Sequence, residues 1–142
     1  MKTLKSKRMV TFMSKSIYIA GPMTGYPEFN FPVFNAVASK LRAEGWTVFN
    51  PAEKESETLS EASLKNGDAV QAAKDGFNFR EVYLWDVEKV ISSDAIYMLP
   101  GWENSPGACG EHAVAVAMRR HYPEYKIIYE GMKDYGEYRA VA

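Results

Sequence analysis

The chain has 142 residues, a formal net charge of −1, 46% hydrophobic and 25% charged residues, and a single cysteine, Cys109. This length and composition are ordinary for one globular domain. One cysteine excludes an internal disulfide and a cysteine-based zinc site, and the near-neutral charge argues against stable nucleic-acid binding. No apolar run approaches the roughly 18 residues that a membrane span needs. We therefore expect a cytoplasmic protein with no membrane partner.

The first 15 residues differ in charge from the rest of the chain. They contain five basic residues and no acidic one, which gives +5, so the remaining 127 residues sum to −6. The basic residues are Lys2, Lys5, Lys7, Arg8 and Lys15. Short basic termini are usually disordered. We expect a disordered leader over 1–15 and a folded domain over 16–142, with contact between the leader and nucleic acid or anionic lipid as the alternative.

The first half of the chain contains two predicted strands with a helix between them. The apolar run 16–22, closed by Gly-Pro, is typical of a buried strand. Apolar residues recur with helical spacing over 31–44, where Gly45 supplies the stop, and "WTVFNP" reads as a second strand. Residues 52–76 are polar and have no sustained period, so we expect a partly mobile surface insert with some helix.

The second half repeats the alternation of helix and strand. Helical spacing returns over 80–92, and the strand 94–100 that follows is nearly all apolar, which predicts cover on both faces. A helix over 110–121 and the strand "YKIIYE" complete the pattern. This order predicts a single-domain α/β fold, Rossmann- or flavodoxin-like, with a doubly wound parallel sheet of four or five strands. The first strand is expected at its centre.

Ligands of such sheets bind beyond the carboxyl ends of the strands. Three loops meet that condition: "AGPMTGYPEFN" at 20–30, "NPAE" at 50–53 and "PGWENSPGACGE" at 100–111. Glu111 is expected in the first turn of the helix that follows, pointing at the crevice. There it has either a functional role or only the stabilisation that the helix dipole gives an acid. Asp94 opens its strand about 20 Å from the carboxyl edge, at roughly 3.3 Å per residue, and is predicted to be a turn residue.

Several well-known catalytic motifs are absent from the sequence. It contains no GxxxxGK(S/T), HExxH, GxSxG or GxGxxG pattern. His112, His121 and Cys109 lack metal-ligand spacing, so neither a metal site nor a cofactor is expected. His112 lies about 100° around the helix from Glu111, which favours a surface or packing role. Asp86, in the preceding helix, is expected to be exposed by default.

Three segments together resemble a known family. They are "IYIAGPMTG", "TVFNP" and "WDVEKVISSDAIYMLPGWENSPGACGEHAVAVAM", followed by a closing strand. They are similar to the nucleoside 2-deoxyribosyltransferase superfamily, which includes the 2′-deoxynucleoside 5′-monophosphate N-hydrolases and phage-encoded relatives of unassigned activity. The resemblance covers residues 16–129 without the insert. It implies an enzyme of nucleotide metabolism that cleaves or exchanges the N-glycosidic bond of a (deoxy)nucleoside 5′-monophosphate.

The resemblance also implies roles for three residues. Glu111 matches the nucleophile, because a carboxylate can stabilise an oxocarbenium-like transition state or trap the sugar covalently. Tyr18 matches the tyrosine that orients this glutamate. Asp86 matches the aspartate near the sugar and the base, and as an acid that protonates the leaving base it needs a raised pKa.

Further residues are expected to bind substrate. Ser105 stands where transferases of free nucleosides carry an aspartate, which favours a 5′-phosphate held by its hydroxyl and by the amides of Gly107 and Ala108; a plain turn or helix-capping role is the alternative. The loop after the first strand, Gly21, Pro22, Met23, Thr24 and Gly25, is also expected to line the site, although Pro22 offers no amide. Trp102 would stack on a base or cover a subunit contact.

Two other classes of function stay open. One is a non-catalytic nucleotide-binding module, since "LPGW…GACGE" loosely echoes the PGG-x-GT-x-x-E loop of lysine-decarboxylase-like phosphoribohydrolases. The other is a phage-type accessory protein on the same fold. In the enzyme reading the partners are a small-molecule nucleotide or nucleoside and a second copy of the chain, because members of the superfamily commonly complete the pocket across a homodimer or a higher homo-oligomer.

Overall fold

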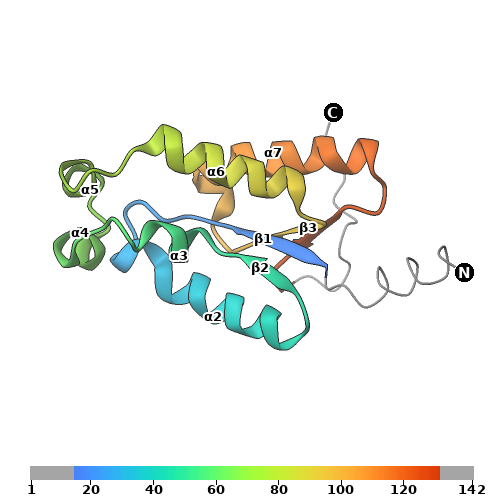
Figure 1. Ribbon diagram of the computed structural model, residues 1–142, viewed down its shortest axis with the longest axis horizontal. Helices are drawn as coiled ribbons and strands as arrows, with labels where there is room; N and C mark the ends of the chain where they lie inside the picture. The colour runs from blue at the N-terminus through green and yellow to red at the C-terminus, as the bar shows by residue number, and fades with distance from the viewer. Residues whose placement is uncertain (1–14, 132–142) are drawn as a thin grey trace, which may run out of the picture.

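A computed structural model describes residues 15–131 of the chain and contains one sheet of four strands. Figure 1 shows that helices lie on both sides of this sheet. The strands are β1 (Ser16–Ala20), β2 (Thr47–Phe49), β3 (Ala95–Met98) and β4 (Lys126–Tyr129). All of them pair in parallel, in the order β2-β1-β3-β4. The predicted doubly wound α/β fold with a central first strand is therefore confirmed. The expected leader, apart from Lys15, and residues 132–142 lie outside the described residues.

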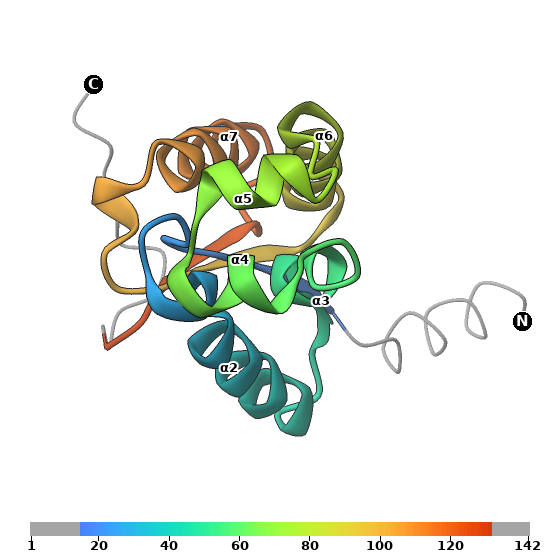
Figure 2. The same cartoon turned by 90° about the vertical axis from the view of Figure 1, so that its left-hand side faces the viewer.

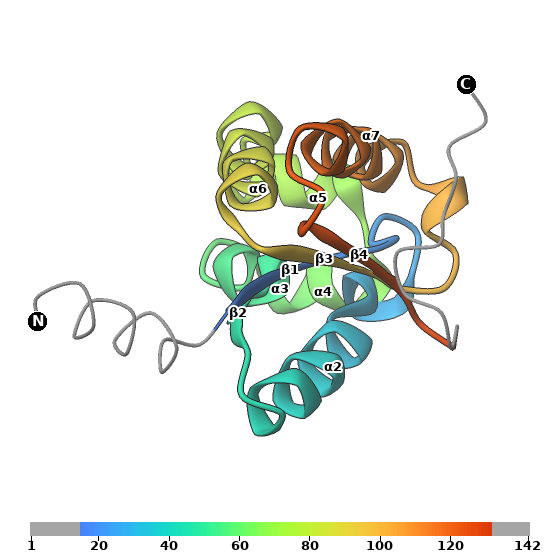
Figure 3. The same ribbon diagram turned by 90° about the vertical axis from the view of Figure 1, so that its right-hand side faces the viewer.

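The long helices divide between the two faces of the sheet. Helix α2 (Phe31–Ala43) covers one face, and α6 (Phe79–Ser92) and α7 (Pro106–His121) lie together on the other (Figure 3). The shorter helices are η1 (Pro27–Asn30), α3 (Pro51–Glu55), α4 (Glu61–Asn66), α5 (Ala69–Lys74) and η2 (Trp102–Asn104). None of the helices within 15–131 combines the length and apolar character that crossing a bilayer requires.

The alternation of side chains along β1 explains the two layers. Ile17 and Ile19 belong to the apolar cluster shared with α2, whereas Tyr18 and Ala20 belong to the cluster shared with α6 and α7. Successive strand residues point to opposite faces, so a strand covered on both sides must be apolar throughout. All four residues of β3 are buried, as its composition predicted. Tyr18 therefore projects toward the same layer that carries α7.

The two ends of the sheet have different roles. From β1 the chain crosses to β2 on one side and later returns past β1 to β3 on the other, so the loops after β1 and β3 diverge and leave a crevice. At the opposite, amino end, the Asp94 carboxylate accepts hydrogen bonds from the Ser16 backbone N–H at 2.8 Å and from its hydroxyl at 3.3 Å. Asp94 thus has the structural role that its position predicted.

Helix α7 begins earlier than the sequence predicted. It starts at Pro106, with Ser105 as its N-cap, instead of at Gly110. The glycines at 107 and 110 disfavour helix by propensity, but Gly110 leaves room for the Tyr83 hydroxyl, which a Cβ would meet. Glu111 is therefore the sixth helical residue and not part of the first turn. The helix dipole acts mainly on the first turn, so it explains this acid poorly.

The insert contains more helix than expected. Helices α3, α4 and α5 fill it, and they lie at the carboxyl end of the sheet, the end that Figure 2 faces. Glu55, Ser63 and Ala72 are buried, so the expectation of a plain surface excursion is wrong at these positions. The Asp75 carboxylate holds α4 to α5, since it accepts hydrogen bonds from the Ser60 backbone N–H and the Gln71 side chain. Three short helices do not produce one sustained period, which is why the sequence pattern missed them.

Candidate functional site

A pocket of about 600 Å³ opens at the crevice between the loops after β1 and β3. Its walls come from the β1–α2 loop, from α3 and α5 of the insert, and from α6 and α7. This volume lies within the roughly 300–1,000 Å³ typical of small-molecule sites. Three carboxyl groups, of Glu55, Asp86 and Glu111, line it together with the phenol groups of Tyr18, Tyr26 and Tyr83.

Tyr18 and Glu111 form a buried hydrogen-bonded pair. The Tyr18 hydroxyl donates to Glu111 Oε2 at 2.7 Å, and the two residues are 1% and 5% exposed. Burial, with a smaller contribution from the charge of Asp86, raises the pKa of Glu111 well above its usual value, and the hydrogen bond from Tyr18 opposes this rise. The geometry thus gives Glu111 a partner that stabilises its charged form, at a distance typical of charge-assisted hydrogen bonds.

Asp86 is buried, contrary to the expectation of an exposed acid. It is 7% exposed, because the side of α6 that carries it faces α7 and β1 instead of solvent. Burial raises the pKa of Asp86 to about 7, and the Tyr18 hydroxyl opposes the shift. Its Oδ1 atom is buried and has no hydrogen-bond partner. An unpartnered carboxylate oxygen that lines a pocket is suited to meet a ligand.

Glu55 is a third buried acid, and the sequence analysis missed it. It is 8% exposed, and burial together with the charge of Asp86 raises its pKa to about 8. Its polar neighbours along "AEKESET" look like a solvated segment, so composition hides it. The one available signal is its position one helical turn after Asn50-Pro51, at the carboxyl end of β2.

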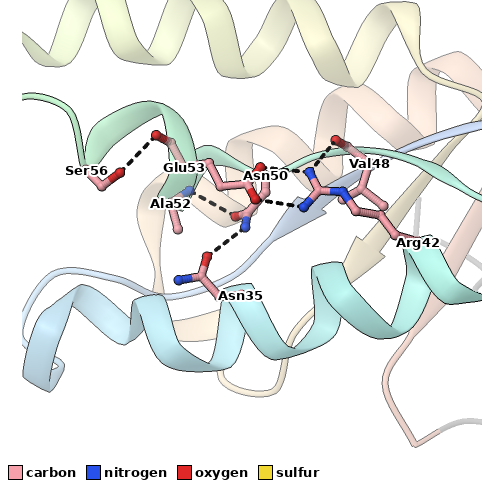
Figure 4. Close-up of polar contacts among 7 residues, drawn as sticks. All are labelled: Asn35, Arg42, Val48, Asn50, Ala52, Glu53 and Ser56. Atoms are coloured by element: carbon pink, nitrogen blue, oxygen red, sulfur yellow. Dashed lines mark hydrogen bonds and ion pairs between the residues drawn. The ribbon is translucent and has the colours of Figure 1, made fainter.

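The orientation of α3, and with it of Glu55, is fixed by a polar network (Figure 4). Asn50 caps the helix by accepting from the Ala52 backbone N–H at 3.0 Å, and its amide donates to the Asn35 side chain at 2.9 Å. Arg42 on α2 forms two 2.7 Å hydrogen bonds to the Glu53 carboxylate (Figure 4). These contacts bind α3 to α2 on its outer side, which leaves Glu55 toward the pocket.

The described lining of the pocket has acidic side chains and no basic ones. Among its described lining residues there are three carboxyl groups and no lysine, arginine or histidine. Neighbouring buried carboxylates cannot all ionise together near neutral pH. Glu55, with a pKa of about 8, keeps its proton there, and the hydroxyl of Tyr18 favours negative charge on Glu111. Burial raises the pKa of all three acids, so the pocket holds carboxylic acids that can donate protons, and the hydrogen bond from Tyr18 opposes this rise at Glu111.

Most of the predicted substrate-binding residues line the pocket, but two do not. The lining includes Gly21, Pro22, Met23, Thr24, Ser105, Gly107 and Ala108. Gly25 turns away, because its N–H donates to the Gly67 carbonyl on the insert at 3.3 Å. The Trp102 ring also lies elsewhere, stacked on the His112 ring with centroids 4.3 Å apart. The left-handed backbone of Gly101, with φ of 87°, opens the short helix that carries this tryptophan.

His112 has the packing role that its position predicted. It is 6% exposed, and its Nε2 atom shares a 2.7 Å hydrogen bond with the Tyr129 hydroxyl. Within residues 15–131, no group of three or more His, Cys, Asp or Glu side chains is arranged to hold a metal ion.

Ser105 has the capping role that the sequence analysis gave as the alternative. Its hydroxyl oxygen accepts from the Ala108 N–H at 3.3 Å, so this amide is already engaged. Pro106, the first helical residue, has no N–H to offer. The hydroxyl proton of Ser105 can still donate to a ligand in the pocket, because the capping bond uses only the oxygen.

An apolar wall is the second feature that sequence reasoning missed. It includes Phe29, Leu59, Phe77 and Phe79, which line the pocket beside the acids. Phe29 reaches it through a left-handed turn in which Glu28, Phe29 and Asn30 all have positive φ. Such a backbone is strained for residues other than glycine and persists where the surrounding structure enforces it. Here the Asn30 side chain donates to the Pro22 carbonyl at 3.0 Å.

The fold and the site together define a class of protein: a doubly wound α/β domain with an acid-lined pocket at its topological switch point. The chain belongs to the family described as Domain of unknown function (DUF4406), whose model matches residues 15–122. This match runs from β1 to the end of α7 and contains every acid of the pocket. Comparison with curated proteins and with solved structures gives no match to the chain.

Proposed function

We propose that this protein cleaves the N-glycosidic bond of a (deoxy)nucleoside 5′-monophosphate, by hydrolysis or by transfer of the sugar to a second base, with Glu111 as nucleophile. The observation that carries the proposal is the buried 2.7 Å hydrogen bond from Tyr18 to Glu111 beside the half-neutralised Asp86. A charged carboxylate next to a protonated one is the arrangement that glycosidic cleavage requires. The resemblance to the nucleoside 2-deoxyribosyltransferase superfamily supports the same three roles.

The reaction divides into two steps. The Glu111 carboxylate forms a bond to C1′ while the C1′–N bond breaks, and the departing base takes the bonding electron pair together with a proton from Asp86. Water then attacks C1′, Asp86 takes a proton from that water, and the C1′–Oε bond breaks to release the sugar and the Glu111 carboxylate. In a transferase a second base replaces the water. Both steps use general acid–base catalysis by one group.

The pKa of Asp86, about 7, suits a group that must give a proton and then take one near neutral pH. Glu55 supports this role when it is uncharged, because its negative charge would favour the protonated form of Asp86 and hinder proton donation. Tyr18 holds the nucleophile and lowers the free energy of its charged form through the donated hydrogen bond.

The 5′-phosphate part of the proposal rests on Ser105. No lysine, arginine or histidine of the described lining is available to a phosphate, so the Ser105 hydroxyl and the Gly107 amide at the start of α7 would have to bind it. We also propose that the protein is a homodimer, which the resemblance supports. The single cysteine supports a cytoplasmic location. Light scattering at micromolar concentration checks the dimer.

The test is the release of free base, followed by chromatography, from a panel of deoxynucleoside monophosphates and deoxynucleosides. Glu111→Gln keeps the shape of the side chain and removes the nucleophile, so turnover should fall below a few per cent of wild type while the melting temperature changes little. Glu88→Gln, at an exposed glutamate of α6 whose side chain is 66% exposed, is the matched control and should keep full activity. A Glu111→Gln variant that retains substantial turnover would exclude Glu111 as nucleophile.

A further inference from the structure

A half-buried tyrosine and an exposed phenylalanine form a stacked aromatic pair in the lining of the pocket. Phe79 and Tyr83, one turn apart on α6, stack with ring centroids 5.1 Å apart and an interplanar angle of 15°. Both rings line the pocket, yet Phe79 is 60% exposed. An apolar ring kept in water at the rim of a cavity gains free energy when a ligand covers it.

The Tyr83 ring of this aromatic pair is held in place by contacts of its hydroxyl with α7. The Tyr83 hydroxyl donates to the Gly107 carbonyl at 2.8 Å, and Gly110 leaves the space that this hydroxyl occupies. Burial raises the pKa of Tyr83 to about 12, so it stays a donor under all physiological conditions. A ring fixed in this way offers its face without the entropy cost of ordering on binding.

The insert contributes further apolar surface to the same pocket. Leu59, Ala72, Ala73 and Phe77 line it, and with Phe29 they give it a mainly apolar wall. None of these five side chains can form a hydrogen bond with the edge of a base. The other walls of the pocket carry its hydrogen-bonding side chains. They are Tyr18, Thr24, Tyr26, Glu55, Tyr83, Asp86, Asn104, Ser105 and Glu111.

We infer that Phe79, Tyr83 and the inner side of the insert form a subsite that binds the aromatic leaving base by stacking and apolar contact. At this subsite the base is selected by ring area and apolar substituents, so purines with apolar groups are favoured over pyrimidines. Stacking accepts any of the bases, because every base has a π-face, and its strength depends on the ring area that is covered. This inference rests on the proposed function for the identity of the ligand as a nucleoside.

Binding can be measured apart from catalysis in the full-length Glu111→Gln variant. The probes are N6-benzyl-2′-deoxyadenosine, 2′-deoxyadenosine, 2′-deoxycytidine and 2-deoxyribose, titrated by calorimetry. We expect affinity to fall in that order, with no detectable heat from 2-deoxyribose. Adding Phe79→Ala should weaken the benzyl compound about tenfold, the loss typical of one base–aromatic stack. Phe79→Tyr keeps a ring and should stay within about twofold.

Leu84→Ala is the matched control, because Leu84 is an apolar residue of the same helix, 71% exposed and outside the pocket lining. It should leave all affinities unchanged. Equal affinity for cytidine and the benzyl compound, no binding of any nucleoside, or an equal effect of the two alanine variants would overturn the subsite. If the four probes bind in the expected order but the wild-type protein releases no base, the subsite is retained and the proposed reaction is refuted. If base release occurs and Phe79→Ala does not change its rate, the proposed reaction is retained and the subsite is refuted.

Discussion

Replacing Tyr18 with phenylalanine isolates one oxygen atom at the centre of the site. The substitution keeps the ring, which is 1% exposed and packed against the layer of α6 and α7. It removes only the hydroxyl that donates to Glu111 Oε2 at 2.7 Å. The result therefore reports what this hydrogen bond contributes and not a loss of packing.

The magnitude follows from the charge and burial of the acceptor. Hydrogen bonds to charged groups contribute about 1.5–3 kcal/mol, and Glu111, at 5% exposure, has little water available as a replacement donor. Each 1.4 kcal/mol is a factor of ten, so kcat/KM should fall about 10- to 100-fold near neutral pH. Loss of the donor also raises the pKa of Glu111 further. Because the nucleophile must be charged, activity should recover as the pH rises.

The assay is base release as a function of pH, combined with the melting temperature. Tyr125→Phe is the control, since its buried hydroxyl donates to the Val90 carbonyl at 2.8 Å and its ring does not line the pocket. Both variants should lose stability, but only Tyr18→Phe should lose activity and shift the acid limb of the pH profile upward. A Tyr18→Phe enzyme with the wild-type rate and profile would refute the role of this hydrogen bond.

Two further predictions concern other groups of the pocket. The folded-state pKa of Glu55, about 8, lies above its ordinary value of 4.5, so the folded protein binds more protons than the unfolded chain between these values and its stability falls as the pH rises. Glu55→Gln should therefore match wild type in thermal unfolding at pH 4.5 and exceed it increasingly toward pH 8; a constant difference would contradict the shift. Ser105→Asp keeps a good N-cap but adds a negative charge beside the proposed phosphate site. For a deoxynucleoside monophosphate, the activation free energy given by kcat/KM should therefore rise by about 2–4 kcal/mol relative to that for its nucleoside. Equal losses for both substrates would exclude a phosphate at this position.

The sequence by itself determined the order of the four strands and the three long helices along the chain, and the parallel sheet. Short apolar runs bounded by Gly and Pro and the helical spacing between them are local signals, and each matches an element of the structure. The location of the site was also predictable, because parallel strands bring their carboxyl ends to one edge. Glu111 follows such a carboxyl end, whereas Tyr18, in the middle of β1, was indicated by the resemblance; the structure joins the two in one hydrogen bond.

Only the tertiary structure decided which polar residues are buried and where the loop side chains point. Glu55 and Asp86 stand among ordinary charged residues in the sequence, and they are buried because α3 and α6 pack around the pocket. Trp102 belongs to a loop at the correct edge, yet its ring packs on His112. Burial and loop direction depend on contacts between segments far apart in the chain. A local pattern does not report such contacts. Glu55 was therefore found only when the elements were assembled, and Asp86 was indicated by the resemblance and not by its neighbours in the sequence.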